Sequence, residues 1–255
     1  MQTSKLLCFD LWGNYAHFRT FYTTSSPLSF AIPPRTAVAG LLGAILGFAD
    51  EYIEIFAPDK SMIGIEVAAP IKKVRMGEKV INTKGDYWIP VKRGSHEPRS
   101  PIRREFVKDP EYRIYVHHKS PEIMAKLQDM LSSHKTVFTP YLGISECIAS
   151  FEFKGVLEAQ NLQSEQKSPL PPFNKRGNGG IPIRTVIPSE FLFSDEAIEF
   201  EAGKQYRKER MPIYMNRDRV VQKYDDVIFE NKGQEIKANV KNCWRTEEGG
   251  NLILF

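Results

Sequence analysis

The sequence predicts an α+β fold in which short strands alternate with two helices. Strand-like apolar segments and segments with helical periodicity alternate over residues 1–160. Over about residues 71–111, charged residues alternate with single apolar ones, which is typical of an exposed β-hairpin inserted into that order. With 255 residues and 42% hydrophobic content, the chain is large enough to bury one substantial core.

The first predicted elements are a strand and an apolar helix. The strand covers residues 5–11 (KLLCFDL). The helix begins within residues 33–36 (PPRT), because proline suits the first helical turn, and the pattern allows it to continue to residue 56. Gly40, Gly43 and Gly47 lie on one helical face, where each costs about 1 kcal/mol relative to alanine. We therefore expect a backbone to approach this face closely, and we expect the sheet to be that neighbour.

The remaining strands and the second helix follow in order. Residues 62–69 (MIGIEVAA) and 112–117 (YRIYVH) are typical of strands and flank the predicted hairpin. Residues 121–131 form a helix, because Ser120 is a suitable N-cap and apolar residues recur on one face. Residues 148–157 supply a fourth strand. This order, β-α-β-β-α-β with a hairpin insertion, is the ferredoxin-like plan.

The C-terminal part has a different composition. Residues 161–181 (NLQSEQKSPLPPFNKRGNGGI) are dense in Pro, Gly, Gln, Ser and Asn, so we expect a flexible loop there. Residues 182–255 alternate charged and apolar residues and suit β-hairpins packed on the main sheet. We therefore expect a domain at 1–160 with its insertion at about 71–111, a loop at 161–181, and a β-rich part at 182–255.

Positive charge is concentrated in the predicted hairpin. The formal net charge of the chain is +4, and residues 72–119 hold thirteen Lys and Arg against six Asp and Glu. Such a segment can bind a polyanion, because Lys and Arg contacts to phosphates release counterions. The alternative is a solvated charged surface. The candidate RNA-binding residues here are Lys72, Lys73, Arg75, Lys92, Arg93, Arg99, Arg103 and Arg104.

A second candidate surface lies between the first strand and the helix. Residues 12–24 (WGNYAHFRTFYTT) interleave aromatic, basic and hydroxyl side chains. Aromatic rings stack on unpaired bases for about 1–3 kcal/mol each, while Arg and hydroxyl groups hold phosphates or 2′-OH groups. We expect Phe18 and Phe21 to face the core. The RNA-facing candidates are Trp12, His17, Arg19 and Tyr22.

Arg35 and Thr36, at the predicted start of the helix, form a third candidate site. The first turn of a helix offers unpaired N–H groups and a partial positive charge, and a guanidinium group reinforces anion binding. We therefore expect a phosphate at this position. The alternative is that Arg35 pairs with a local acid such as Asp10.

One long ordered segment resembles a known family. Residues 9–47 (FDLWGNYAHFRTFYTTSSPLSFAIPPRTAVAGLLGAILG), supported by residues 140–153 (PYLGISECIASFEF), are similar to the signature of the fifth Cas protein family. These proteins are RAMP-superfamily subunits of type I CRISPR surveillance complexes, and the likeness is to the type I-B members. The resemblance implies a ferredoxin-like, RRM-type domain whose inserted hairpin is called the thumb. It also implies a non-catalytic subunit that caps the 5′ handle of the guide RNA in a type I-B Cascade complex.

The resemblance also implies partners. These are the guide RNA, the Cascade large subunit and the first backbone subunit, and target DNA near the PAM is a further partner that it allows. In the family the thumb intrudes between nucleotides of the guide, which makes Trp88, near the expected tip, a candidate wedge. We expect a cytoplasmic protein with no membrane partner, because its longest apolar run is too short to span a bilayer. We also expect that the protein is not an obligate homo-oligomer.

Two other functions stay open. One branch of the family, in type I-C systems, is a metal-independent endoribonuclease that processes the repeat RNA, and in that case His17 and Tyr15 are the candidate catalytic residues. The other alternative is an assembly scaffold that acts mainly through protein contacts. The sequence has no cluster with metal-ligand spacing and no phosphate-binding P-loop, so we expect neither a metal nor a cofactor.

Overall fold

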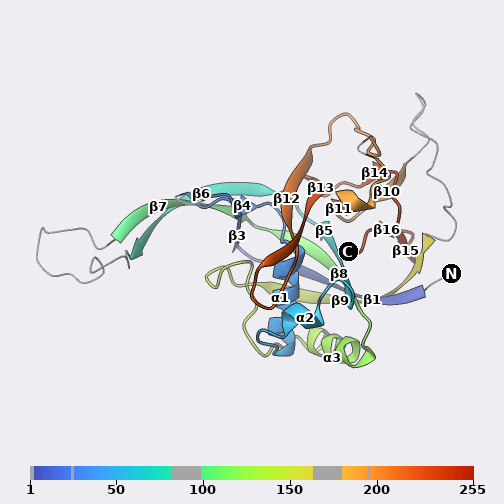
Figure 1. Ribbon diagram of the computed structural model, residues 1–255, viewed down its shortest axis with the longest axis horizontal. Coiled ribbons are helices and arrows are strands. Elements are labelled where there is room, and N and C mark those ends of the chain that lie inside the picture. Colours follow the sequence, from blue (N-terminus) through green and yellow to red (C-terminus); the bar gives the residue numbers. More distant parts are fainter. Residues whose placement is uncertain (1–2, 24–25, 82–98, 163–179, 195) are drawn as a thin grey trace, which may run out of the picture.

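The computed structural model of the protein describes residues 3–23, 26–81, 99–162, 180–194 and 196–255. Figure 1 shows a strand-rich body from which one long hairpin projects, with the α-helices gathered at one side. These helices are α1 (Arg35–Leu46), α2 (Tyr52–Ile55) and α3 (Pro121–Ser132). Most of the described secondary structure is strand, so the fold is mostly β rather than an even α+β mixture.

The main sheet contains the predicted strands in the order β16-β15-β9-β1-β8-β5, and adjacent strands are antiparallel. The strands predicted at 5–11, 62–69, 112–117 and 148–157 are confirmed as β1, β5, β8 and β9. Two short strands of the C-terminal part, for which the sequence predicts β-hairpins on the main sheet but no individual bounds, extend the sheet beyond β9. The bounds are β1 Thr3–Trp12, β5 Ser61–Val67, β8 Glu111–His118, β9 Ser150–Asn161, β15 Trp244–Thr246 and β16 Asn251–Leu252.

The C-terminal residues bring the edges of this sheet close to one another. Phe255 and Ile63 of β5 exchange two backbone hydrogen bonds, both of 3.0 Å, directly after the chain has left β16. Val186 also donates its N–H to the Ile65 carbonyl at 2.8 Å. Because the same segment reaches both edges, the sheet is nearly closed into a barrel.

Alternation along β1 divides the core between the two faces of the sheet. Leu7, Phe9 and Leu11 belong to the large core that includes residues of α1 and α3, while Leu6 and Cys8 belong to a smaller cluster on the other face. All five side chains are buried, as expected for a strand covered on both faces.

The glycines of α1 face α2, and our expectation that they face the sheet is wrong. A Cβ atom on Gly43 would lie 2.6 Å from the Cβ atom of Tyr52, and one on Gly40 would lie 3.6 Å from its ring. Gly47 has a φ of 85° and ends α1, so the helix does not continue and α2 is a separate element. The missing side chains make room for a tyrosine rather than for a strand.

The inserted hairpin is formed by β6 (Lys72–Ile81) and β7 (Arg99–Lys108), between β5 and β8 in the chain. At its base, β2 (Tyr15–Ala16) pairs with β7. Both strands lie within residues 71–111, where the sequence predicts the insertion. Trp88, expected near the tip, and the candidate cations Lys92 and Arg93 lie outside the described residues.

The C-terminal part forms small sheets besides β15 and β16. Most of the expected loop, residues 163–179, lies outside the described residues. In the part of the chain that is described, no helix is both long and apolar enough to cross a membrane. The other elements of the C-terminal part are β10 (Ile181–Ile183), β11 (Ile187–Pro188), η3 (Ser189–Phe191), β12 (Tyr206–Met215), β13 (Val221–Glu230) and β14 (Ile236–Ala238). In the N-terminal part, the short strands β3 (Phe18–Arg19) and β4 (Ser29–Phe30) pair with each other.

Candidate nucleic-acid interface

The register of the hairpin gives it two chemically different faces. Arg75 is opposite Glu105, and Ile81 is opposite Arg99. Residues directly opposite one another point to the same face, and side chains alternate between faces along each strand. One face, here called the cationic face, therefore carries Lys73, Arg75, Lys79, Arg99 and Arg103. The other, here called the apolar face, carries Val74, Met76, Val80 and Ile102.

Two of the predicted RNA-binding residues lie on the apolar face. Lys72 is opposite Lys108 on that face. Arg104 is half-buried there, and its Nε lies 3.1 Å from a carboxylate oxygen of Glu78. The sequence indicated a basic hairpin, but only the strand register separates the cations that share a surface from those that do not.

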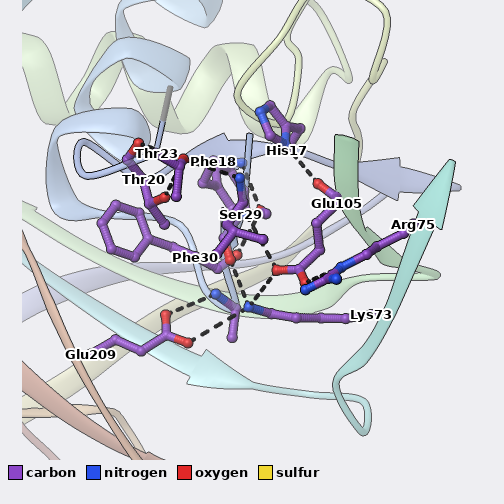
Figure 2. A network of polar contacts seen from close by, with 12 residues as sticks. His17, Phe18, Thr20, Thr23, Ser29, Phe30, Lys73, Arg75, Glu105 and Glu209 are labelled. Atoms are coloured by element: carbon purple, nitrogen blue, oxygen red, sulfur yellow. Dashed lines mark hydrogen bonds and ion pairs between the residues drawn. The ribbon is translucent and has the colours of Figure 1, made fainter. Parts of the chain in front are cut away.

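A buried carboxylate, Glu105, organises the base of the cationic face (Figure 2). Its Oε1 lies 3.1 Å from Lys73 Nζ, and its Oε2 lies 3.6 Å from Arg75 Nε. Lys73 also donates to the Ser29 carbonyl at 2.6 Å and lies 3.8 Å from Glu209 of β12. Lys73 is thus held by protein groups, whereas the Arg75 side chain is 67% exposed.

His17 is a structural residue in this arrangement, so our expectation that it faces RNA is wrong. Its side chain is buried, and Nδ1 donates a hydrogen bond to the Glu105 carbonyl at 2.7 Å. Burial lowers the pKa of the imidazole, and the Glu105 carbonyl opposes this only in part. Tyr15, the other residue considered for catalysis, is half-buried with its ring against Phe106. Neither group is presented on an open surface.

The loop before α1 exposes aromatic rings, though not all of those expected. Phe18 is buried as predicted, but Phe21 is 55% exposed, so the expectation that it faces the core is wrong. Its ring lies 5.2 Å from that of Tyr22 and 5.0 Å from that of Tyr224 in β13. Arg210 lies 6.0 Å from the centre of the Tyr224 ring. The C-terminal part thus contributes to an aromatic group that sequence reasoning missed.

Trp12 lies apart from these rings. It is the last residue of β1 and is partly exposed, at 38%. Its position in the alternation places it on the same face of the sheet as Asp10, opposite the face on which Leu11 packs. Asp10 accepts a hydrogen bond from Arg113 at 2.7 Å and lies 3.3 Å from Lys154. Trp12 therefore lies near a paired charge cluster and not in the exposed loop.

A cleft of about 610 Å³ lies beside α1 and brings Arg19 and Thr36 together. Tyr52, Phe138 and Tyr141 line it with aromatic rings. The cleft is also lined by Asp50 and Arg219, which form an ion pair at 2.9 Å. Of these residues, only Arg19 and Thr36 were indicated by the sequence, although Tyr141 lies in the segment PYLGISECIASFEF.

Arg35 does not form a phosphate site, which corrects our expectation. Its side chain is only 2% exposed, and its guanidinium donates to the carbonyls of Phe255 (2.7 Å), Phe56 (2.9 Å) and Ser61 (3.0 Å). It also donates to the Ser61 hydroxyl at 2.9 Å. The alternative pairing with Asp10 is wrong as well. Burial lowers the pKa of Arg35 to about 10, so the group remains charged at neutral pH.

The architecture is that of a strand-rich protein with a projecting hairpin that is cationic on one face. A family model described as CRISPR-associated protein (Cas_Cas5) matches residues 6–220, which is most of the chain. The chain belongs to this family of CRISPR-associated proteins, which confirms the resemblance to the fifth Cas protein family, whereas its type I-B subtype stays a prediction. A search of curated proteins found no match.

Solved structures are similar to this chain at low sequence identity. A chain of a structure entitled "CRISPR RNA-guided surveillance complex" is 12% identical with a TM-score of 0.51, and the match covers 90% of this chain and 91% of that one. A CRISPR protein from Archaeoglobus fulgidus is 14% identical with a TM-score of 0.48, covering 98% of both chains. At these identities, the likeness to the first structure supports the fold alone.

Proposed function

We propose that this chain binds the guide RNA of a type I CRISPR surveillance complex and that it caps the 5′ handle as a type I-B subunit. Membership of the CRISPR-associated family supports the complex. The observation that carries the RNA-binding proposal is the cationic face of the hairpin. On this face, the exposed side chains of Arg75, Lys79, Arg99 and Arg103 project from one two-stranded ribbon.

The geometry of this face suits an extended phosphate backbone. Residues two apart on one strand are separated by about 6.6–6.8 Å, so cations on one face form a row along the ribbon. A positively charged surface that tracks the backbone, next to rings on which bases stack, is the general arrangement for binding single strands. Phe21 and Tyr22 supply exposed rings on the loop whose Pro27 contacts Glu105 at the base of the hairpin, and Arg19 of the same loop supplies a further cation.

We further infer how the rest of the molecule serves this function. The strand order β9-β1-β8-β5, with α1 and α3 as connections, supports a ferredoxin-like reading of the main sheet. The apolar face of the hairpin suits contact with a neighbouring subunit, as the large or the backbone subunit would provide. Burial of His17 favours a non-catalytic role over endoribonuclease activity.

A salt titration tests RNA binding against the scaffold alternative. The probe is a synthetic RNA with the 5′ handle of the cognate CRISPR repeat, and its affinity is measured at several salt concentrations. For a single strand the slope of log K against log salt is about −0.7 per phosphate neutralised. We expect a slope of about −2 or steeper. A flat response would favour a scaffold and contradict the proposal.

A matched pair of double variants tests the site. Arg99→Ala with Arg103→Ala removes two charges from the cationic face, whereas Lys72→Ala with Lys108→Ala removes two charges from the opposite face of the same hairpin. We expect the first pair to weaken binding and to flatten the salt slope by about 1.4, and the second to have a small effect. Equal effects of the two pairs would rule out the cationic face as the binding surface.

The nuclease alternative has its own assay. The purified protein is incubated with the cognate repeat RNA in EDTA, and cleavage is followed by gel electrophoresis. We expect no specific cut. A specific cut that is lost in His17→Ala would establish the endoribonuclease instead.

A further inference from the structure

We propose that Glu105 is a positioning residue for RNA: an acidic side chain, set at the base of the cationic face, that strengthens the binding of a polyanion. This inference rests on the proposed function. It goes beyond it by assigning a favourable role to a group whose charge repels the ligand. The juxtaposition that carries it is a buried carboxylate between two consecutive cations of the same face (Figure 2).

The Glu105 carboxylate forms ion pairs with both cations at the base of the cationic face. The Glu105 side chain is 12% exposed, and its two oxygens are divided between Lys73 and Arg75 at 3.1 Å and 3.6 Å. The ammonium group of Lys73 is occupied by this ion pair and by its hydrogen bond to the Ser29 carbonyl. Arg75 has an exposed side chain, so one of its nitrogens is held while the rest of the guanidinium stays available. A pre-ordered guanidinium loses less conformational entropy when it meets a phosphate.

The same residue fixes the hairpin against the loop that carries the exposed rings. The Glu105 N–H donates to the Pro27 carbonyl at 2.9 Å, and its own carbonyl accepts from His17. The Ser29 N–H lies 3.4 Å from Oε1. A two-stranded ribbon has little stability alone, so these contacts set the direction in which it projects from the body.

The ion pairs around Glu105 reach the C-terminal part through Lys73. Glu209 of β12 lies 3.8 Å from Lys73 Nζ and accepts a hydrogen bond from the Ala31 N–H at 3.0 Å. Three segments that are distant in sequence therefore meet at one ion-pair cluster beneath the cationic face. If the cluster positions Arg75, its loss disturbs RNA binding. Phe30 and Phe106, next to the cluster, belong to the main core, so the folded fraction has to be measured together with the affinity.

The sign of the effect separates positioning from simple electrostatics. Glu105→Gln keeps the shape and one acceptor oxygen, but removes a negative charge close to the proposed path of the RNA. Through electrostatics alone, this change strengthens the binding of a polyanion. Through positioning, it weakens binding, because Arg75 has to be ordered by the RNA itself. We expect about three- to tenfold weaker binding, the size of the cost of immobilising one long side chain.

The experiment compares wild type, Glu105→Gln, Arg75→Ala and the double variant, all as the full chain with the handle RNA. We expect Glu105→Gln to weaken binding in the wild-type background and to add little when Arg75 is already absent. The control is Glu78→Gln, which removes the same charge from the same hairpin on the apolar face, where Glu78 pairs with Arg104. We expect the control to leave affinity unchanged or slightly higher.

The binding measurements can contradict either the positioning role of Glu105 or the proposed function. Unchanged or tighter binding by Glu105→Gln overturns the proposal, and so does an equal loss with and without Arg75, which would show a general structural effect. Stoichiometric titration accompanies each affinity measurement, so that a smaller folded fraction is not mistaken for a higher Kd. If wild type itself does not bind the RNA at low salt, the proposed function fails, and that result is distinct from failure of the role of Glu105.

Discussion

Replacement of Arg35 by alanine tests whether this residue is structural. In the structure its guanidinium satisfies three backbone carbonyls and one hydroxyl, which belong to Phe56, Ser61 and Phe255. A buried acceptor that loses its donor costs about 1–3 kcal/mol. The variant no longer buries a charged group, and this gain offsets part of the total cost of the unpaired acceptors. We expect Arg35→Ala to lower the free energy of unfolding by about 3–5 kcal/mol, a large share of the usual 5–15 kcal/mol.

Urea denaturation followed by circular dichroism measures this loss. Arg75→Ala is the control, because its side chain is 67% exposed and surface substitutions usually change stability by less than about 0.5 kcal/mol. Arg35→Lys should recover only part of the loss, since one ammonium group cannot reproduce the planar fork. A loss below about 1 kcal/mol for Arg35→Ala would refute the reasoning. So would RNA binding that falls more than the folded fraction does.

Two further predictions concern stability. Because burial lowers the pKa of His17, its contribution to stability is complete above the unfolded pKa of about 6.5 and is lost as the pH falls through the folded pKa. His17→Gln should therefore show less acid destabilisation than wild type in denaturant titrations, and an identical pH profile would contradict this. Gly40→Ala should stabilise α1 by up to about 1 kcal/mol, whereas Gly43→Ala should cost about 1–3 kcal/mol because its Cβ would meet Tyr52 at 2.6 Å. Melting temperatures that shift in the same direction would disprove the assigned packing.

Much of the local structure could be predicted because its signals are local. The alternation of charged and apolar residues marked the hairpin, and Pro34 before Arg35 marked the start of α1. The N-cap Ser120 marked α3, where its side chain accepts from the Ile123 N–H at 3.4 Å. The short strands β15 and β16 carry no such signal, since they are ordered by the sheet edge that they join.

The sequence by itself determined the order of the elements, the basic character of the hairpin and the family. These properties depend on residue types and their spacing within a few turns or strands. The roles of single side chains were decided by the tertiary structure. Arg35 is covered by Phe255, and His17 is bound by Glu105, so residues 220 and 88 positions apart decide whether each can meet a ligand. Burial and ion pairing depend on such distant neighbours, and a local pattern does not contain them.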